Sequence, residues 1–444
     1  MLLAAPLARA ETRPQYGGTL RVLLRAAPSS LDPGDTSQPD SLARRTITSL
    51  LFDTLVTADP NGTVKGALAE AWEVVGGGQR MQFRLRPGVK FQDGAPLTPE
   101  IAASSLRRVH SSWNIVPAGD SIFIESGTPE TELLEELALP RSAIVRRDSE
   151  DRLSGTGPFQ VVDWQSGKAL TLAAQDASWR GRPFVDEINI NLSISFRDQR
   201  TALELGRADI VEVAPEEINR FPQERFRMAH STPIRLEALL FTRDASSDQE
   251  TALRQVLRFS VERASMHNVI LQGAGQSTGA LLPMWMSGYG FVFPVEADLA
   301  KARQLRNTVQ SVPAWTLGYD GSDSLARLLA ERIALNARDA GLTLRPSSSP
   351  GADLRLAQIP LSSLDPWVSL NNLVNELGMM APPAKGHSIE DLYAAEQALL
   401  VSGRIIPLFH LPASYASGQD LRGWVVRGDG SLDLAGAWLK SGQR

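Results

Sequence analysis

The pattern with the clearest catalytic potential is a G-x-S-x-G sequence at residues 275–279, whose serine is Ser277. In many serine hydrolases this pattern exposes a nucleophilic serine on a strained turn between a strand and a helix. Here the preceding residues, 251–271, have helical periodicity, and residues 280–283 read ALLP. We therefore expect a flexible glycine-rich loop that leaves a helix. A hydrolase remains an alternative, and keeping it would require that Ser277→Ala abolish a measured esterase activity.

Metal and nucleotide chemistry have no support in the spacing of residues along the chain. The five histidines do not stand at metal-ligand spacing from one another; they are His110, His230, His267, His387 and His410. The sequence contains no Walker A pattern and no G-x-G-x-x-G after a strand. The paired acids Glu135–Glu136 and Glu216–Glu217 are expected on solvated helix faces. We therefore expect no cofactor, no metal and no catalytic centre.

Composition limits the size class, the partners and the chemistry of the chain. The chain has 444 residues, enough for two or three domains, and its 43% apolar and 21% charged residues are ordinary for a globular protein. The formal net charge of -5 provides no basic surface for nucleic acid. The chain has no cysteine, which excludes disulfides, thiolate metal sites and cysteine nucleophiles.

The first residues indicate export. They form a short apolar run followed by Ala8-Arg9-Ala10, which fits the A-x-A pattern of a signal-peptide cleavage site. We interpret residues 1–10 as the remnant of a signal peptide. No later stretch reaches the ~18 consecutive apolar residues of a membrane span. The mature chain is therefore expected to be a soluble periplasmic protein.

Strand and helix patterns alternate along the chain, which predicts an α/β fold. Residues 81–85 alternate between apolar and polar side chains, as in a half-buried strand. Thr98 before Pro99, and Ser388 with Asp391, are helix-start signals. We expect strands at residues 19–24, 81–85, 160–164, 169–174, 405–410 and 423–426, and helices at 42–55, after Thr98, at 251–271, at 324–340 and after Ser388.

Several short stretches carry a family resemblance through their order along the chain. They read YGGTL at 16–20, SLDP at 30–33, LFDTL at 51–55, FRLRPGVKFQDG at 83–94, GTGPF at 155–159, WRG at 179–181 and RQVLRFSVER at 254–263. Together they resemble the peptide/nickel-type (family 5) extracellular solute-binding proteins of ABC importers. The resemblance implies a periplasmic-binding-protein-like, two-lobed clamp of type II, similar to cluster C, with an extra subdomain and a hinge. Lobe I would comprise residues 11–40, 152–234 and 404–444, the subdomain 41–151, and lobe II 235–403.

One position departs from the oligopeptide-binding members that the chain resembles. In them an aspartate three residues before an acidic-Pro pair holds the amino terminus of the peptide. The matching pair here is Asp365-Pro366, which places Ser362 at the aspartate position. A neutral hydroxyl cannot form the charge-assisted bond that a carboxylate forms with an ammonium group. We therefore expect binding to depend less on a free amino terminus.

The predicted cleft needs aromatic walls and a few polar groups. The stretches after Trp113 and after Asn372 are short for the family. This shortening indicates either an altered pocket or loop trimming without functional change. The candidate ligand-binding residues are Ser37, Trp113, Trp285, Ser362 and Trp367. The resemblance implies a monomer that captures a small solute, peptide-like or otherwise polar, and delivers it to the permease subunits of an ABC importer, with no enzymatic activity. The alternative is a ligand-sensing module of a regulatory or chemoreceptor system.

Overall fold

A computed structural model describes residues 13–59, 62–76, 80–222, 224–380 and 386–440. The expected signal-peptide remnant, residues 1–10, lies outside these described residues. Among the helices that the described ranges contain, none combines the length and the apolar character needed to cross a membrane.

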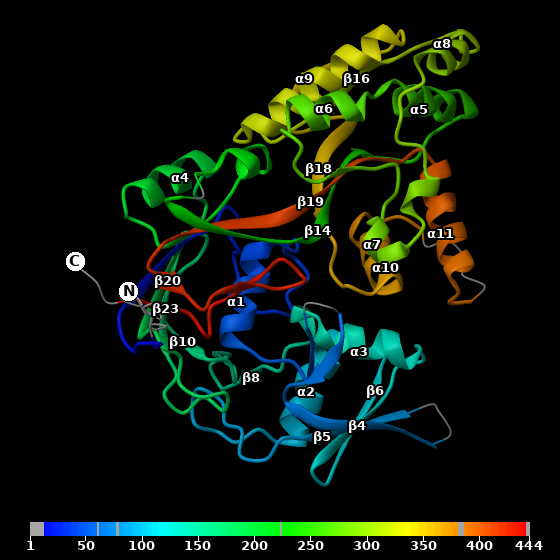
Figure 1. The fold of residues 1–444 in the computed structure, drawn as a ribbon. Coiled ribbons are helices and arrows are strands. Elements are labelled where there is room, and N and C mark those ends of the chain that lie inside the picture. Colours follow the sequence, from blue (N-terminus) through cyan, green and yellow to red (C-terminus); the bar gives the residue numbers. More distant parts are fainter. Residues whose placement is uncertain (1–12, 60–61, 77–79, 223, 381–385, 441–444) are drawn as a thin grey trace, which may run out of the picture.

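An eleven-stranded mixed sheet runs through the molecule (Figure 1). Its strands are, in spatial order, β10 (Phe159–Gln165), β11 (Ala169–Ala174), β12 (Glu187–Asn191), β1 (Thr19–Leu23), β13 (Ile210–Glu212), β19 (Ile405–Gly418), β14 (Phe226–Phe241), β18 (Leu354–Pro360), β16 (Ala314–Gly318) and β17 (Thr343–Ser347), while β15 (Gln276–Ser277) pairs with β19. The long antiparallel strands β14 and β19 occupy the middle of the sheet and join its two halves.

The apolar side chains form separate cores on the two sides of these long strands. In the first lobe, β1 and β10–β12 pack against helix α1 (Leu42–Leu51), which ends before the expected residue 55. In the second lobe, two cores surround the far ends of β14 and β19. The fold is therefore a two-lobed α/β clamp, and the residue limits given above for the lobes and the subdomain stay a prediction.

The first lobe carries an additional four-stranded sheet below α1 in Figure 1. The order of its strands is β4 (Ala69–Val75), β5 (Arg80–Leu85), β7 (Ser121–Glu125) and β6 (Asn114–Ala118), and helices α2 (Pro99–Val109) and α3 (Glu130–Ala138) pack with it. The alternation in residues 81–85 is confirmed, because Met81, Phe83 and Leu85 are buried in this core. Thr98 caps α2 with Pro99 in its first turn, as predicted.

The remaining elements complete the two lobes. In the first lobe they are β2 (Val56–Ala58), β3 (Val64–Gly66), β8 (Arg146–Arg147), β9 (Leu153–Ser154), α4 (Phe196–Glu204), β20 (Leu421–Arg422), β21 (Val425–Val426), β22 (Leu432–Asp433) and β23 (Trp438–Leu439). In the second lobe they are α5 (Asp248–Ser260), α6 (Arg263–Val269), α7 (Met284–Ser287), α8 (Leu299–Asn307), α9 (Ser324–Asp339), α10 (Pro366–Glu376) and α11 (Ile389–Val401). The predicted helix at 324–340 and its stop are confirmed, since Gly341 has a φ of +80°.

The single helix expected at residues 251–271 is wrong, because α5 and α6 are separate helices. At the break the Glu262 N–H donates to Asn336 Oδ1 (3.2 Å). The buried Arg263 guanidinium then donates from Nε to the Pro407 carbonyl of β19 (2.8 Å). These contacts with distant segments redirect the chain, although the apolar periodicity of the sequence continues through the break.

A buried carboxylate joins three of the stretches that carry the family resemblance. Asp53 accepts hydrogen bonds from Thr156 Oγ1 (2.9 Å) and Trp179 Nε1 (2.8 Å), and it pairs with Arg180 Nη2 (2.6 Å). The chain at Gly155 lies so close to α1 that an added Cβ would stand 1.9 Å from the Leu51 carbonyl oxygen. The LFDTL, GTGPF and WRG stretches are therefore one structural unit of the first lobe.

The capping box predicted at Ser388 is present, with Ser388 Oγ accepting from the Asp391 N–H (3.1 Å). Replacing Ser388 with alanine is expected to lower the free energy of unfolding by about 1 kcal/mol, because a helix-end N–H loses its partner. Urea denaturation followed by circular dichroism measures the change. The control is Ser104→Ala on the exposed face of α2, which should not lower stability; equal stability of Ser388→Ala and the wild type would contradict the prediction.

Candidate functional site

A cleft of about 930 Å³ lies between the two lobes. The first lobe contributes the loop at residues 33–40, one face of α1, and parts of α2 and α3. The second lobe contributes Ser362 and the face of α10 that carries Val368, Asn372 and Glu376. A cavity of this volume, lined from both lobes, is large enough to enclose a small molecule.

One wall of the cleft is a flat aromatic surface. The rings of Trp113 and His110 are stacked, with centroids 3.8 Å apart and an angle of 7° between their planes. His110 is buried and its Nε2 lies 2.8 Å from Ser142 Oγ. Burial lowers the pKa of His110 to about 4, so the imidazole is neutral at physiological pH. The pair therefore presents an uncharged aromatic surface to the cleft.

Several charged groups of the cleft are already paired with other side chains. Glu136 holds Arg141 through bonds of 2.6 and 2.5 Å, and Arg141 Nη2 donates to Asn372 Oδ1 of the second lobe (2.8 Å). Glu132 Oε1 lies 2.5 Å from His387 Nδ1. Three side chains of α10 that line the cleft have no hydrogen bond or ion pair with other described residues: the amides Asn371 and Asn375 and the carboxylate Glu376.

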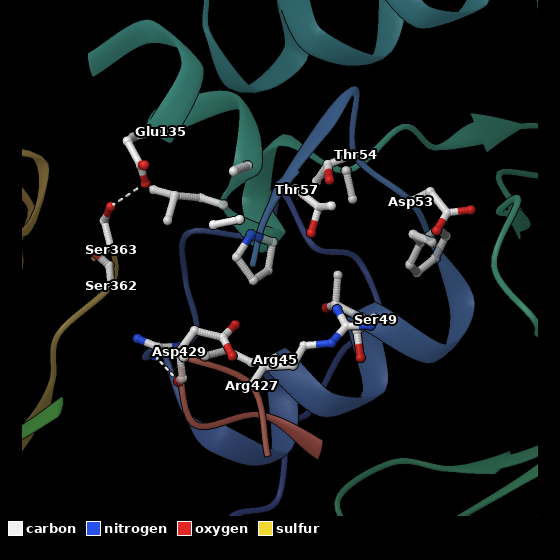
Figure 2. Close-up of a pocket in the computed structure, with 18 of the residues that line it drawn as sticks. Arg45, Ser49, Asp53, Thr54, Thr57, Glu135, Ser362, Ser363, Arg427 and Asp429 are labelled. Carbon is white, nitrogen blue, oxygen red and sulfur yellow. Dashed lines mark hydrogen bonds between the residues drawn. The ribbon is translucent and has the colours of Figure 1, made fainter. Parts of the chain in front are cut away.

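A smaller cavity of about 80 Å³ adjoins the cleft and shares Arg45 and Ser362 with it. Figure 2 shows this cavity, with Ser49, Thr54 and Thr57 on one side and the Ser362–Ser363 turn on the other. The buried Arg45 guanidinium donates to the Asp429 carbonyl (2.6 Å) and, across the lobes, to the Leu361 carbonyl (2.9 Å). Arg45 thus links Asp429 of the first lobe to Leu361, which precedes the Ser362–Ser363 turn of the second lobe.

The expectation that Glu135 and Glu136 lie on a solvated helix face is wrong for Glu135. Its side chain is only 9% exposed, and its Oε2 accepts a hydrogen bond from Ser363 Oγ (3.0 Å). Burial raises the pKa of Glu135 to about 6, the Ser363 hydrogen bond opposes the rise, and the Asp365 carboxylate adds to it. The face is covered because α3 meets the turn before α10, a contact between residues more than 200 positions apart.

Three of the predicted ligand-binding residues line the same cleft: Ser37, Trp113 and Ser362. Ser37 is exposed and its Oγ donates to Asp35 Oδ1 (2.6 Å). The Ser362 hydroxyl accepts from Asn372 Nδ2 (2.8 Å). The structure therefore brings together side chains from three distant segments, and their part in binding stays a prediction.

The other two predicted residues lie elsewhere. Trp285 is 40% exposed, donates from Nε1 to the Pro233 carbonyl (2.9 Å), and lines a separate hollow of about 380 Å³. Trp367 is only 8% exposed in the second-lobe core, and its Nε1 donates to the His387 carbonyl (3.3 Å). Trp367 thus supports the loop that carries His387.

Sequence reasoning missed the polar residues of α3, of the turn after it and of α10 that line the cleft: Glu132, Glu136, Arg141, Asn371, Asn372, Asn375 and Glu376. The one available signal was spacing. Residues 132, 135 and 136 share a helix face opposite Leu133 and Leu137. That spacing identifies a polar face, but it contains no information about which distant segment the face meets.

The described residues form neither a metal-ligand cluster nor a nucleophile elbow. No group of three or more His, Asp or Glu side chains placed to hold a metal ion occurs within the described ranges. A loop leaves helix α6 as expected, but it is tied to the sheet at one point, because Ser277 belongs to the two-residue strand β15 and pairs with Phe409 of β19. The next helix, α7, begins only at Met284, so the strand–turn–helix geometry of a nucleophile elbow is not formed.

Two lobes joined by two long strands, with an aromatic and polar cleft between them, define a solute-binding protein. The chain belongs to the bacterial extracellular solute-binding proteins of family 5, because the model of the middle region of that family matches residues 63–359.

Curated relatives and solved structures agree with this assignment. The chain is 24% identical over 364 residues to the "Probable D,D-dipeptide-binding periplasmic protein DdpA" of Escherichia coli, covering 74% of this chain and 70% of the relative. It is 24% identical over 344 residues to the nickel-binding periplasmic protein of E. coli, covering 66% and 64%. The fold is similar to that of the E. coli murein tripeptide binding protein MppA, with a TM-score of 0.83 and 14% identity over 97% of this chain and 100% of that one.

Proposed function

We propose that this chain captures a small solute in the 930 Å³ cleft and delivers it to the permease subunits of an ABC importer. The observation that carries the proposal is the lining of one cleft by both lobes, since a solute bound there would hold the lobes together. The relatives are periplasmic binding and transport proteins, which favours import over a sensing module. We further propose a monomer in the periplasm without enzymatic activity.

The chemistry of the walls supports a particular kind of solute. The acids Glu132 and Glu136 are already paired with cationic or imidazole partners, and Ser362 replaces the expected carboxylate. The remaining groups include the Trp113 indole, the amides of α10 and, at the end of α10, the Glu376 carboxylate. We therefore propose an amphipathic, peptide-like solute with an apolar part against Trp113 and neutral hydrogen-bonding groups against α10.

A thermal-shift screen of di- and tripeptides with free and with acetylated amino termini tests this proposal. A bound solute at a hundred times its Kd should stabilise the protein by about 2.7 kcal/mol. We expect binders whose effect survives acetylation, because no unpaired carboxylate stands at the Ser362 position. Stabilisation that strictly requires a free amine would overturn the proposed solute class.

Replacing Trp113 with alanine is expected to weaken binding of the best peptide about ten- to thirtyfold, because the solute loses its aromatic contact surface. Isothermal titration calorimetry measures the Kd. The control is Phe291→Ala, which removes a 70% exposed aromatic side chain that is absent from the cleft lining. Equal affinities of Trp113→Ala and the wild type would show that the solute does not bind against this wall.

A further inference from the structure

Helix α3 of the first lobe and the turn that follows it, which carries Arg141, meet the second lobe through three polar contacts. Glu132 lies 2.5 Å from His387, Glu135 accepts from Ser363 (3.0 Å), and Arg141, held by Glu136, donates to Asn372 (2.8 Å). The acids at positions 132, 135 and 136 stand on one face of α3, which lies beside α10 in Figure 1. The three partners come from three separate segments of the second lobe. Together these contacts form an acidic latch between the lobes, here named the α3 latch.

The part of the latch on the second lobe is held in place by its own hydrogen bonds. The Ser363 carbonyl accepts from Ser369 Oγ (2.6 Å), and Ser363 Oγ accepts from the Asp365 N–H (3.0 Å). Asp365 caps α10 by accepting from the Val368 N–H (2.9 Å). The Asp365 carboxylate is therefore fixed close to the acids of α3 whenever the lobes are together.

Carboxylates outnumber cations around the centre of the latch. The charged groups around Glu135 come from every element packed against it. They are Asp365 and His387 of the second lobe, Glu132, Glu136 and Arg141 on its own side, Arg45, Asp53, Arg180, Arg427 and Asp429 around the small cavity, and the Lys65–Asp59 pair of the β2–β3 hairpin that packs on α3. Arg141 is bound by Glu136, and Lys65 by Asp59. Bringing the lobes together thus moves Glu132 and Glu135 out of water and towards Asp365.

We infer that closing the α3 latch takes up a proton, so that the closed form of the clamp is favoured as the pH falls from about 8 to about 5. The inference goes beyond the proposed function, because it concerns the lobes themselves and requires no particular solute. It also predicts that any solute held by both lobes binds more tightly at the acid end of this range.

The direction of the pH effect depends on how the environment of the carboxyl groups differs between the open and the closed form. In the open form Glu135 is hydrated and has an ordinary affinity for protons, whereas in the closed form burial raises its pKa to about 6. Burial also raises the pKa of Glu132, although His387 opposes that rise. A group whose pKa is raised by closing favours the closed state at low pH and loses this contribution as the pH rises through the closed-state value.

The absence of cysteine allows the lobes to be labelled cleanly for single-molecule fluorescence energy transfer. Ser104→Cys on α2 and Gln397→Cys on α11 introduce one label site on an exposed position of each lobe. The solute-free protein is measured from pH 5 to pH 8.5. The ratio of closed to open molecules is expected to be about five- to tenfold higher at pH 5 than at pH 8.

Glu135→Gln in the same labelled protein retains a side chain that can accept from Ser363 but cannot titrate. This variant should lose most of the pH dependence, whereas the matched control Glu130→Gln, exposed in the first turn of α3, should retain it. A wild-type ratio that does not change with pH, or an unchanged slope in Glu135→Gln, overturns the inference. Circular dichroism of each variant verifies folding, and Ser363→Ala provides a second test, because its pH dependence should be steeper than that of the wild type. Failure of the peptide screen would contradict the proposed function and leave this result standing, because no solute is present.

Discussion

Replacing Asp53 with alanine is expected to lower the free energy of unfolding by about 2 to 4 kcal/mol. Asp53 is 3% exposed and serves Thr156, Trp179 and Arg180 at once. Without the carboxylate, the hydroxyl and the indole N–H lose their acceptor in a place that water does not reach easily. The Arg180 guanidinium is about a third exposed, which is why the expected loss stays below that of a fully buried ion pair.

Urea denaturation followed by tryptophan fluorescence measures this loss. The control is Glu70→Ala, which removes an ion pair with Arg84 (2.9 Å) between two more exposed side chains. The control should change stability by less than about 1 kcal/mol. A loss in Asp53→Ala no larger than that of the control would show that the three stretches are held together by packing alone.

Asp53 also marks the limit of what the sequence can show about the fold. The stretches at 51–55, 155–159 and 179–181 are recognisable from their residues and order, and they predict the two-lobed clamp that the structure has. That one carboxylate joins all three is not visible, because the bonds link residues more than 100 positions apart. Local patterns identify the segments, and only the tertiary structure pairs them.

The element predictions fail where a distant contact overrides a local pattern. The capping box at Ser388 and the stop at Gly341 depend on residues within one turn, and both are confirmed. The helix at 251–271 is interrupted because Asn336 and Pro407 bind the chain at the break. Periodicity carries no trace of these partners.

The candidate site was predicted only in part, because it too depends on contacts between distant segments. A cleft lined by tryptophan and hydroxyl groups is a general expectation for small-molecule binding, and it identified Trp113, Ser37 and Ser362, which line one cleft. Residue type could not reveal that Trp367 points into the core, nor that Glu135 is covered by a turn of the other lobe. Both facts follow from how α3 and α10 meet.

Strand β14, which joins the lobes, contains a buried acid, Glu237, that should make the stability of the protein depend on pH. Glu237 is 3% exposed and its Oε2 has no hydrogen-bond partner among the described residues. Burial raises its pKa to about 8; a hydrogen bond with Gln358 opposes the rise, Asp323 adds to it, and Arg235 opposes it. The carboxyl is therefore largely protonated in the folded protein at neutral pH, whereas it is ionised in the unfolded chain.

Glu237 should stabilise the folded protein at low pH and destabilise it at high pH. A carboxyl whose pKa is raised by folding contributes stability that is fully present below the ordinary glutamate value and is lost as the pH rises through about 8. Glu237→Gln keeps the shape of the side chain and cannot ionise. The variant should match the wild type at pH 5 and exceed its free energy of unfolding by about 2 to 4 kcal/mol at pH 9.

Urea denaturation at pH 5, 7 and 9 tests this expectation, with the difference between variant and wild type as the measured quantity, because other buried acids such as Glu396 shift both proteins equally. The matched control is Glu73→Gln on the exposed face of β4, for which the difference should stay near zero at every pH. A difference for Glu237→Gln that does not grow between pH 5 and pH 9 would mean that the hinge opens enough to hydrate Glu237. In that case the paired strands β14 and β19, which join the lobes, would be the flexible part of the clamp.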